Sequence, residues 1–207
     1  MPELDLYYAR SGNSLRAAIA LELSGVPYAR HELDLAGQQQ KSESFLAMNP
    51  AGHVPVLILT GPDGRTALPQ SGAIMDYLLR QHRPDLYPED EIARANCTAS
   101  FLAALSDVAI QNALARYLSS QPDAAQFVLD RMLADLRALF CPVETTPYLC
   151  GNAVTIADYA HFPVVYMRET RLRSEPDCSH VLRWLDRMKA DSAVARAVAF
   201  SGLQIES

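Results

Sequence analysis

The sequence predicts an α/β domain followed by an all-α domain. Up to about residue 83, runs that alternate like strands are interleaved with segments whose apolar residues recur at helical spacing. The proline-bearing stretch 84–88 then has the composition of a linker. Beyond it the strand signal disappears, and segments rich in Ala and Leu follow. We therefore expect domains over residues 1–83 and 89–207, joined by a linker over 84–88.

The first domain is predicted to run strand, helix, strand, helix, strand, strand, helix. Its first three elements form a βαβ unit, and the next helix leads into a turn. The two following strands flank a turn and form a hairpin. In chain order the predicted elements cover residues 4–8, 14–23, 28–35, 42–48, 56–59, 66–68 and 70–83.

Val54-Pro55 lies where a loop enters the third predicted strand. Proline suits the first residue of a strand, because its missing N–H costs least there. From composition alone a trans peptide bond is favoured, since only about 5–6% of X–Pro bonds in folded proteins are cis.

The second domain is predicted to consist of helices over residues 92–118, 127–140, 155–168, 181–189 and 193–200. Thr155 can cap the third of these helices. The carboxylate of Asp158 can reach back to the backbone N–H of Thr155, as in a capping box with Asp in the usual Glu place. We expect this pair to stabilise the fold and to take no part in chemistry.

Composition and charge limit the classes of function. The 207-residue chain has a net charge of −6 and no cluster of Lys and Arg, which argues against nucleic acid as the partner. No apolar run approaches the roughly 20 residues of a membrane span, and the N-terminus has no signal-peptide pattern. The four cysteines have no metal-ligand spacing. We therefore expect a cytoplasmic protein with free thiols and with no metal, nucleic-acid or membrane partner.

Three features together carry a resemblance to a known family: the Val54-Pro55 step, the Gln70-Ser71 pair before a helix, and the stretch from Thr155 to Asp158. With them, nearly the whole chain resembles the cytosolic glutathione transferases. The resemblance implies a thioredoxin-like βαβ-α-ββα domain followed by the family's helical domain, and it implies a cis Val54–Pro55 bond. It further implies glutathione as co-substrate and a homodimer.

Gln70 and Ser71, taken alone, are typical of a helix start and little else. A carboxylate at that position would gain from the helix dipole and from charge-assisted hydrogen bonds. The resemblance implies that this pair holds the γ-glutamyl end of glutathione.

The resemblance also assigns the rest of glutathione. The backbone of Val54, before Pro55, is expected to pair with the cysteinyl part, much as an added strand pairs with a sheet edge. Lys41 and His53 are expected near the glycyl carboxylate, and solvated surface side chains are the alternative for both.

The thiol of glutathione has to ionise. Lowering a thiol pKa by two units needs roughly 2.7 kcal/mol of selective thiolate stabilisation, and one hydrogen bond to a charged group contributes about 1.5–3 kcal/mol. The stretch Ser11-Gly12-Asn13-Ser14 resembles serine-type members, with the Ser11 hydroxyl as donor, and has Asn13 where bacterial beta-type members carry Cys. The Asn13 amide can donate as well. From the residues alone, Ser11 is a turn serine and Ser14 caps the first helix.

No cysteine occupies this stretch, so mixed-disulfide chemistry with a protein thiolate is disfavoured. The second substrate is expected to be a small, apolar electrophile, because such pockets are mostly apolar. Tyr8, Asp107 and Gln111 are the residues expected at the acceptor pocket.

The sequence thus predicts a glutathione transferase-like enzyme that activates the glutathione thiol for attack on an apolar electrophile. A binding protein with the same fold and no turnover is the main alternative. A glutathione-dependent peroxidase, an isomerase and a dehalogenase also stay open, because the first domain would look the same in each.

Overall fold

The computed structural model describes residues 3–203, which divide into two compact units. The N-terminal unit comprises residues 3–84 together with Ser192–Leu203. The helical unit comprises Asp85–Asp191. The fold class predicted from the sequence, an α/β domain followed by an all-α domain, is confirmed.

The N-terminal unit is built on a four-stranded sheet with the strand order β2-β1-β3-β4. Strand β1 (Glu3–Tyr8) is parallel to β2 (Ala29–Glu32) and antiparallel to β3 (Val56–Gly61), which is antiparallel to β4 (Gly64–Pro69). The predicted βαβ unit and hairpin are confirmed. Strand β2 is shorter than predicted, because Glu32 is already paired with Tyr8, where β1 ends.

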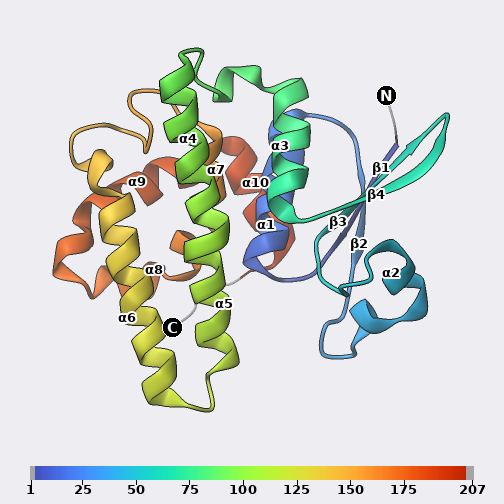
Figure 1. The fold of residues 1–207 in the computed structure, drawn as a ribbon, viewed down its shortest axis with the longest axis horizontal. Coiled ribbons are helices and arrows are strands. Elements are labelled where there is room, and N and C mark those ends of the chain that lie inside the picture. Colours follow the sequence, from blue (N-terminus) through green and yellow to red (C-terminus); the bar gives the residue numbers. More distant parts are fainter. Residues whose placement is uncertain (1–2, 204–207) are drawn as a thin grey trace. The chain divides into compact units, whose positions relative to one another are not determined.

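Helices cover both faces of this sheet (Figure 1). Helices α1 (Gly12–Ser24) and α3 (Ser71–His82) pack side by side, and α10 (Ser192–Ser201) packs on α1. On the opposite face, Phe45 of the short α2 (Glu43–Met48) packs against Val56 and Ile58 of β3. Successive residues of β1 point to opposite faces, and Leu4, Leu6 and Tyr8 on one face are buried.

Residues 192–203 belong to the N-terminal unit, whereas the predicted domain boundaries assigned them to the helical domain. Arg196 of α10 pairs with Glu22 of α1 at 2.7 Å, and the rings of Phe200 and Tyr8 meet edge to face with centroids 5.2 Å apart. A helical pattern alone does not say which neighbour buries its apolar face, so the sequence could not reveal this docking. The predicted end of the domain, residues 204–207, lies outside the described residues.

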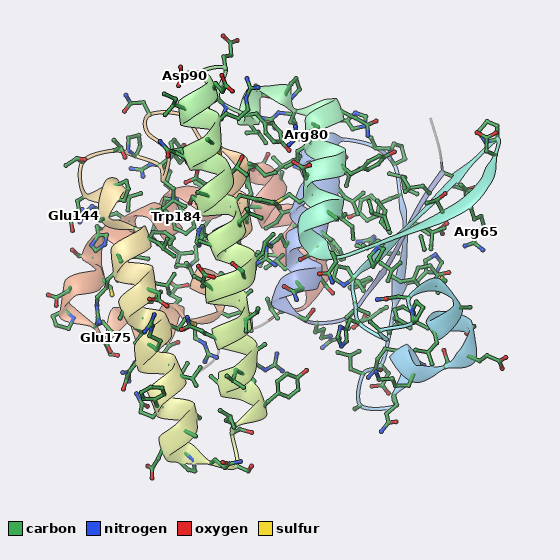
Figure 2. The ribbon with its side chains drawn as sticks, viewed as in Figure 1. Arg65, Arg80, Asp90, Glu144, Glu175 and Trp184 are labelled. Carbon is green, nitrogen blue, oxygen red and sulfur yellow. The ribbon has the colours of Figure 1, made fainter. Side chains whose placement is uncertain are left out.

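The helical unit contains the other predicted helices of the second domain and one that was not predicted. The unpredicted helix is α8 (Glu169–Arg173), and α6 (Pro122–Leu139) begins earlier than expected because Pro122 is accommodated in its first turn. Buried Trp184 of α9 lies among these helices (Figure 2), with its ring 4.8 Å from that of Phe140. The helices are α4 (Glu91–Ala103), α5 (Ala109–Tyr117), α6 (Pro122–Leu139), α7 (Ile156–Met167), α8 (Glu169–Arg173) and α9 (Ser179–Lys189).

The capping box at the start of α7 is confirmed. The backbone N–H and hydroxyl of Thr155 donate to Oδ2 of Asp158 at 2.9 and 3.0 Å. The N–H of Leu149 and Nε1 of Trp184 donate to Oδ1 at 3.0 and 2.8 Å. The fully buried carboxylate thus ties three segments of the unit together, as expected of a structural residue.

A π-helical segment, Ala104–Val108, joins α4 and α5 into one stretch of 27 residues. Its mean hydropathy reaches 1.2 over 18 residues, so length and composition alone would allow it to cross a membrane. Arg94, Asp107 and Arg116 interrupt this stretch, so it is not the uninterrupted apolar run that the sequence was expected to lack. Within the helical unit the same stretch packs against α6 and α7.

Candidate functional site

The loops that carry the predicted site residues meet at one end of the strands. Val56, the first residue of β3, lies opposite Tyr7 of β1 on one side and Pro69 of β4 on the other. The loop with Val54 and Pro55 therefore enters the sheet between the chain that leads into α1 and the chain that leads into α3. The Val54–Pro55 peptide bond is cis, as the resemblance implied.

Ser11 caps α1. Its backbone is extended (φ −149°, ψ 155°), and its Oγ accepts from the N–H of Ser14 at 3.2 Å and donates to Oγ of Ser14 at 3.0 Å. The prediction that Ser14 caps this helix is therefore wrong. Helix α1 begins at Gly12, so Ser14 lies in its first turn, buried, and accepts from the N–H of Ala9 at 3.2 Å.

Asn13 lies exposed in the first turn of α1. Its Oδ1 accepts a hydrogen bond of 2.7 Å from Nη1 of Arg16. The same Nη1 donates to Oγ of Ser71 at 3.1 Å, in the first turn of α3. Arg16 thus connects the N-termini of two helices that the chain separates widely. Sequence reasoning did not single out Arg16, because a charged residue beside an apolar helix face is usually solvated.

Gln70 precedes α3 with φ 74° and ψ 115°, a backbone conformation that residues other than glycine rarely adopt. Its exposed side chain makes no capping bond to the helix, whereas Ser71 is buried. Such strain in a residue other than glycine is typical of functional sites.

The region favours anions. Neither α1 nor α3 has an acidic residue in its first turn, so no carboxylate there offsets the positive ends of the helix dipoles. Burial lowers the pKa of Arg16 to about 10, and the guanidinium therefore stays charged at neutral pH. Two helix N-termini and one buried cation together suit a ligand with more than one negative group.

Lys41 and His53 lie at the loop that leads to the Val54–Pro55 bond, and both side chains are exposed. Nζ of Lys41 donates to the carbonyl of Ala51 at 3.4 Å, and the carbonyl of His53 accepts from Nδ2 of Asn49 at 2.7 Å. Gly52 has φ 65°, and a Cβ there would come within 2.7 Å of Nζ of Lys41. The Lys41 side chain is thus held close to the loop that leads to the cis bond.

The predicted acceptor residues fall in both units. Tyr8 is only 7% exposed, packs against Phe200 in the N-terminal unit, and has its pKa raised by burial. Packing within the N-terminal unit therefore explains the burial of Tyr8. Asp107 and Gln111 line a groove of about 410 Å³ between the π segment, α5 and α6 of the helical unit. Nε2 of Gln111 donates to a carboxylate of α6, Oδ2 of Asp135, at 2.7 Å.

Two thiols that are distant in the sequence meet in the helical unit. A hydrogen bond from Cys150 lowers the pKa of Cys97 to about 6, and the same contact raises the pKa of Cys150. All four cysteines are free and belong to this unit, so none lies at the strand ends described above. Within residues 3–203, no group of three His, Cys, Asp or Glu side chains is placed to hold a metal ion.

Comparison with known proteins agrees with this architecture. The family models for the N-terminal and C-terminal domains of glutathione S-transferases match residues 10–81 and 105–191. A probable maleylacetoacetate isomerase of Caenorhabditis elegans is 34% identical over 167 residues, which are 77% of this chain and 75% of that protein. A zeta-class glutathione S-transferase of Euphorbia esula is 33% identical over 185 residues, 82% of this chain and 78% of that protein.

The fold also has close structural relatives. The crystal structure of a glutathione transferase homologue from Sulfitobacter, with bound glutathione, has a TM-score of 0.82 and 26% identity, and the match covers 99% of this chain and 100% of that one. Both domains, their order and their sequences therefore agree with one family. The chain belongs to the glutathione S-transferase family.

Proposed function

We propose that the protein binds glutathione where the loops before α1, β3 and α3 meet, and activates its thiol for attack on a small apolar electrophile. The observation that supports this best is the pair of helix N-termini joined through Arg16 beside the Val54–Pro55 loop. Glutathione presents a γ-glutamyl carboxylate and, once ionised, a thiolate. Each would lie near donors that favour negative charge.

The γ-glutamyl end is assigned to Gln70 and Ser71. The oxygen of Ser71 already accepts from Arg16, so its hydroxyl hydrogen is available to a carboxylate. The strained backbone of Gln70 presents its side chain outside the helix cap. The backbone of Val54, before Pro55, is assigned to the cysteinyl part.

The opposite end of glutathione is assigned to Lys41 and His53. The ammonium group of Lys41, held against the loop by its bond to Ala51, would pair with the glycyl carboxylate. Both side chains are exposed, so this contact should contribute less than those at α3.

The thiol is assigned to Ser11 and Asn13. On binding, the Ser11 hydroxyl would exchange its bond to Ser14 for one to the sulfur. The amide hydrogens of Asn13 provide a second donor, because Arg16 occupies its oxygen. Two such donors cover the roughly 2.7 kcal/mol that a two-unit drop in thiol pKa needs. The thiolate would then form a carbon–sulfur bond to the electrophile.

Asp107 and Gln111 remain our proposal for the acceptor side. Their groove also contains Ile110 and Leu139, so it offers apolar surface next to a few polar groups, as sites for small molecules commonly do. A homodimer and a cytoplasmic location are proposed on the family's pattern.

Calorimetry of the purified protein with glutathione tests the binding site. We expect a dissociation constant between micromolar and millimolar that Gln70→Ala and Ser71→Ala each weaken by about tenfold, the loss of one hydrogen bond to a charged group. Gln81→Ala, at the far end of the same helix, serves as the matched control. No binding at millimolar glutathione would refute the proposal.

Ser11→Ala tests turnover. We expect kcat/KM toward an electrophilic acceptor to fall at least about tenfold while glutathione affinity stays similar, because the hydroxyl stabilises only the ionised thiol. An unchanged rate would transfer the role to Asn13. Binding without turnover of any acceptor would favour the binding-protein alternative.

Isomerisation is a second candidate, favoured by the 34% identity to a probable maleylacetoacetate isomerase. The same thiolate would add reversibly to a conjugated double bond, allow rotation, and leave again. Conversion of maleylacetoacetate without net loss of glutathione would support this activity. Consumption of glutathione with a thioether product would support the transferase.

A further inference from the structure

Arg16 is the most buried charged side chain of the N-terminal unit, with 0% exposure. It lies on α1, where most of the other buried residues are apolar. A buried charge is unfavourable unless hydrogen bonds hold it, and replacing it by an apolar residue often stabilises a protein. The hydrogen bonds that hold Arg16 therefore bear directly on its role.

Two hydrogen bonds of a single Arg16 nitrogen, Nη1, have an informative geometry. Nη1 carries two hydrogens, and it donates to Oδ1 of Asn13 at 2.7 Å and to Oγ of Ser71 at 3.1 Å. Both acceptors are neutral, and both keep their own hydrogens. Because the guanidinium occupies their oxygens, the amide hydrogens of Asn13 and the hydroxyl hydrogen of Ser71 are directed away from it.

We infer that Arg16 is a positioning residue of the glutathione site, which aims the donors of Asn13 and Ser71 at the thiolate and the γ-glutamyl carboxylate at once. This inference rests on the function proposed above. Arg16 acts through these two side chains and through its charge, and it does not contact glutathione itself. One guanidinium thus couples the sites of two negative groups of the ligand, the γ-glutamyl carboxylate and the thiolate.

Two substitutions separate charge from geometry. Arg16→Met keeps an unbranched stem and removes the buried charge, a change that commonly leaves a protein folded. Arg16→Lys keeps the charge but loses the planar group that holds two acceptors in a fixed direction. Arg80→Met is the matched control, since Arg80 is an exposed arginine on α3 that pairs with Asp76 within the same helix (Figure 2).

The experiment measures glutathione affinity by calorimetry and the pKa of the bound thiol by the ultraviolet absorbance of the thiolate. In Arg16→Met we expect the thiol pKa to rise by about one unit and affinity to fall about tenfold, the effect of one lost hydrogen bond to a charged group. The thiol pKa and the glutathione affinity of Arg16→Lys should lie between those of Arg16→Met and wild type. Arg80→Met should match wild type in both measurements.

A double-mutant cycle with Asn13→Ala tests whether Arg16 acts through Asn13. If it does, Arg16→Met shifts the thiol pKa much less in the Asn13→Ala background than in wild type. Additive shifts would contradict a positioning role. Should Arg16→Met fail to fold, the cycle is run with Arg16→Lys.

The outcomes distinguish the two proposals. If wild type binds glutathione and Arg16→Met keeps both the affinity and the thiol pKa, this inference is overturned. The proposed function is then left intact. Wild type that does not bind glutathione would overturn the proposed function, and this inference with it.

Discussion

At the scale of single residues, two buried charged side chains differ in their roles. Asp158 stabilises the fold, whereas Arg16 is proposed to serve the glutathione site. Asp158 accepts four hydrogen bonds within the helical unit and is fully buried. Burial raises its pKa, while the N–H and O–H donors oppose that shift. Arg16 is just as buried, but two of its hydrogen bonds join residues assigned to ligand binding.

Asp158→Ala should destabilise the protein by about 3–5 kcal/mol, because it leaves several buried donors without an acceptor. Urea denaturation measures this loss. Asp186→Ala is the control, since its side chain is 63% exposed, and it should change stability by less than about 0.5 kcal/mol. A loss below about 1 kcal/mol in Asp158→Ala would show that water replaces the missing carboxylate.

Gln70→Gly should leave stability within about 1 kcal/mol of wild type, because glycine adopts a positive φ without strain but loses more entropy on folding. Glutathione affinity should nonetheless fall, since the proposed contact of the Gln70 side chain is lost. Thermal unfolding and calorimetry on the same preparation check both statements. Unchanged affinity would show that the strained backbone at φ 74° serves no ligand contact through this side chain.

At the scale of elements, helices α8 and α9 are joined through one carboxylate. Glu169 of α8 is paired with Arg173 of the same helix and with Lys189 at the end of α9. Burial opposes ionisation of Glu169, but the bonds from Lys189 and Arg173 outweigh it and lower its pKa. The short α8 is therefore held in place by charge as well as by packing.

The stability that Glu169 contributes should depend on pH. Since its pKa is lower in the folded state, the contribution is complete above the ordinary pKa of about 4.3 and is lost as pH falls through the lowered value. Glu169→Gln should cost about 1–3 kcal/mol at pH 7 and progressively less below pH 4 or so. Glu144→Gln, at an exposed position, is the control (Figure 2). A difference that is independent of pH would contradict the ion pairing.

At the scale of the whole molecule, the chain returns to its first unit at its end. After the helical unit, α10 packs on α1, and Phe200 contacts Tyr8 and lies under the guanidinium of Arg30. The N-terminal unit thus contains segments from both ends of the described chain. Helix α1, which Ser11 caps and which carries Asn13 and Arg16, depends on this late segment for part of its core.

A chain truncated after Asp191 should therefore lose protection in α1. Hydrogen exchange is expected to speed up for amides of α1, because α10 no longer packs on that helix. Amides of α6 and α7, in the other unit, provide the internal reference. Equal protection of α1 in the full and truncated chains would show that α10 contributes little to that core.

Local patterns determined much of this protein. Apolar alternation and helical spacing located the strands and most helices, and the Thr155–Asp158 spacing located the cap of α7. These features depend on neighbours within a few residues, so the sequence alone displays them. The sequence did not determine the start of α1 at Gly12, because Ser11 and Ser14 can both cap a helix. Only the backbone conformation of Ser11 decides between them.

Only the tertiary structure decided the contacts between distant segments. It showed that α10 belongs to the N-terminal unit, that Cys97 meets Cys150, and that Arg16 joins Asn13 to Ser71. Each contact depends on which faces the fold buries against each other, and local periodicity carries no information on such pairing. For the same reason the sequence indicated the residues at the proposed glutathione site, and the packing of α1 on α3 revealed the buried arginine that connects them.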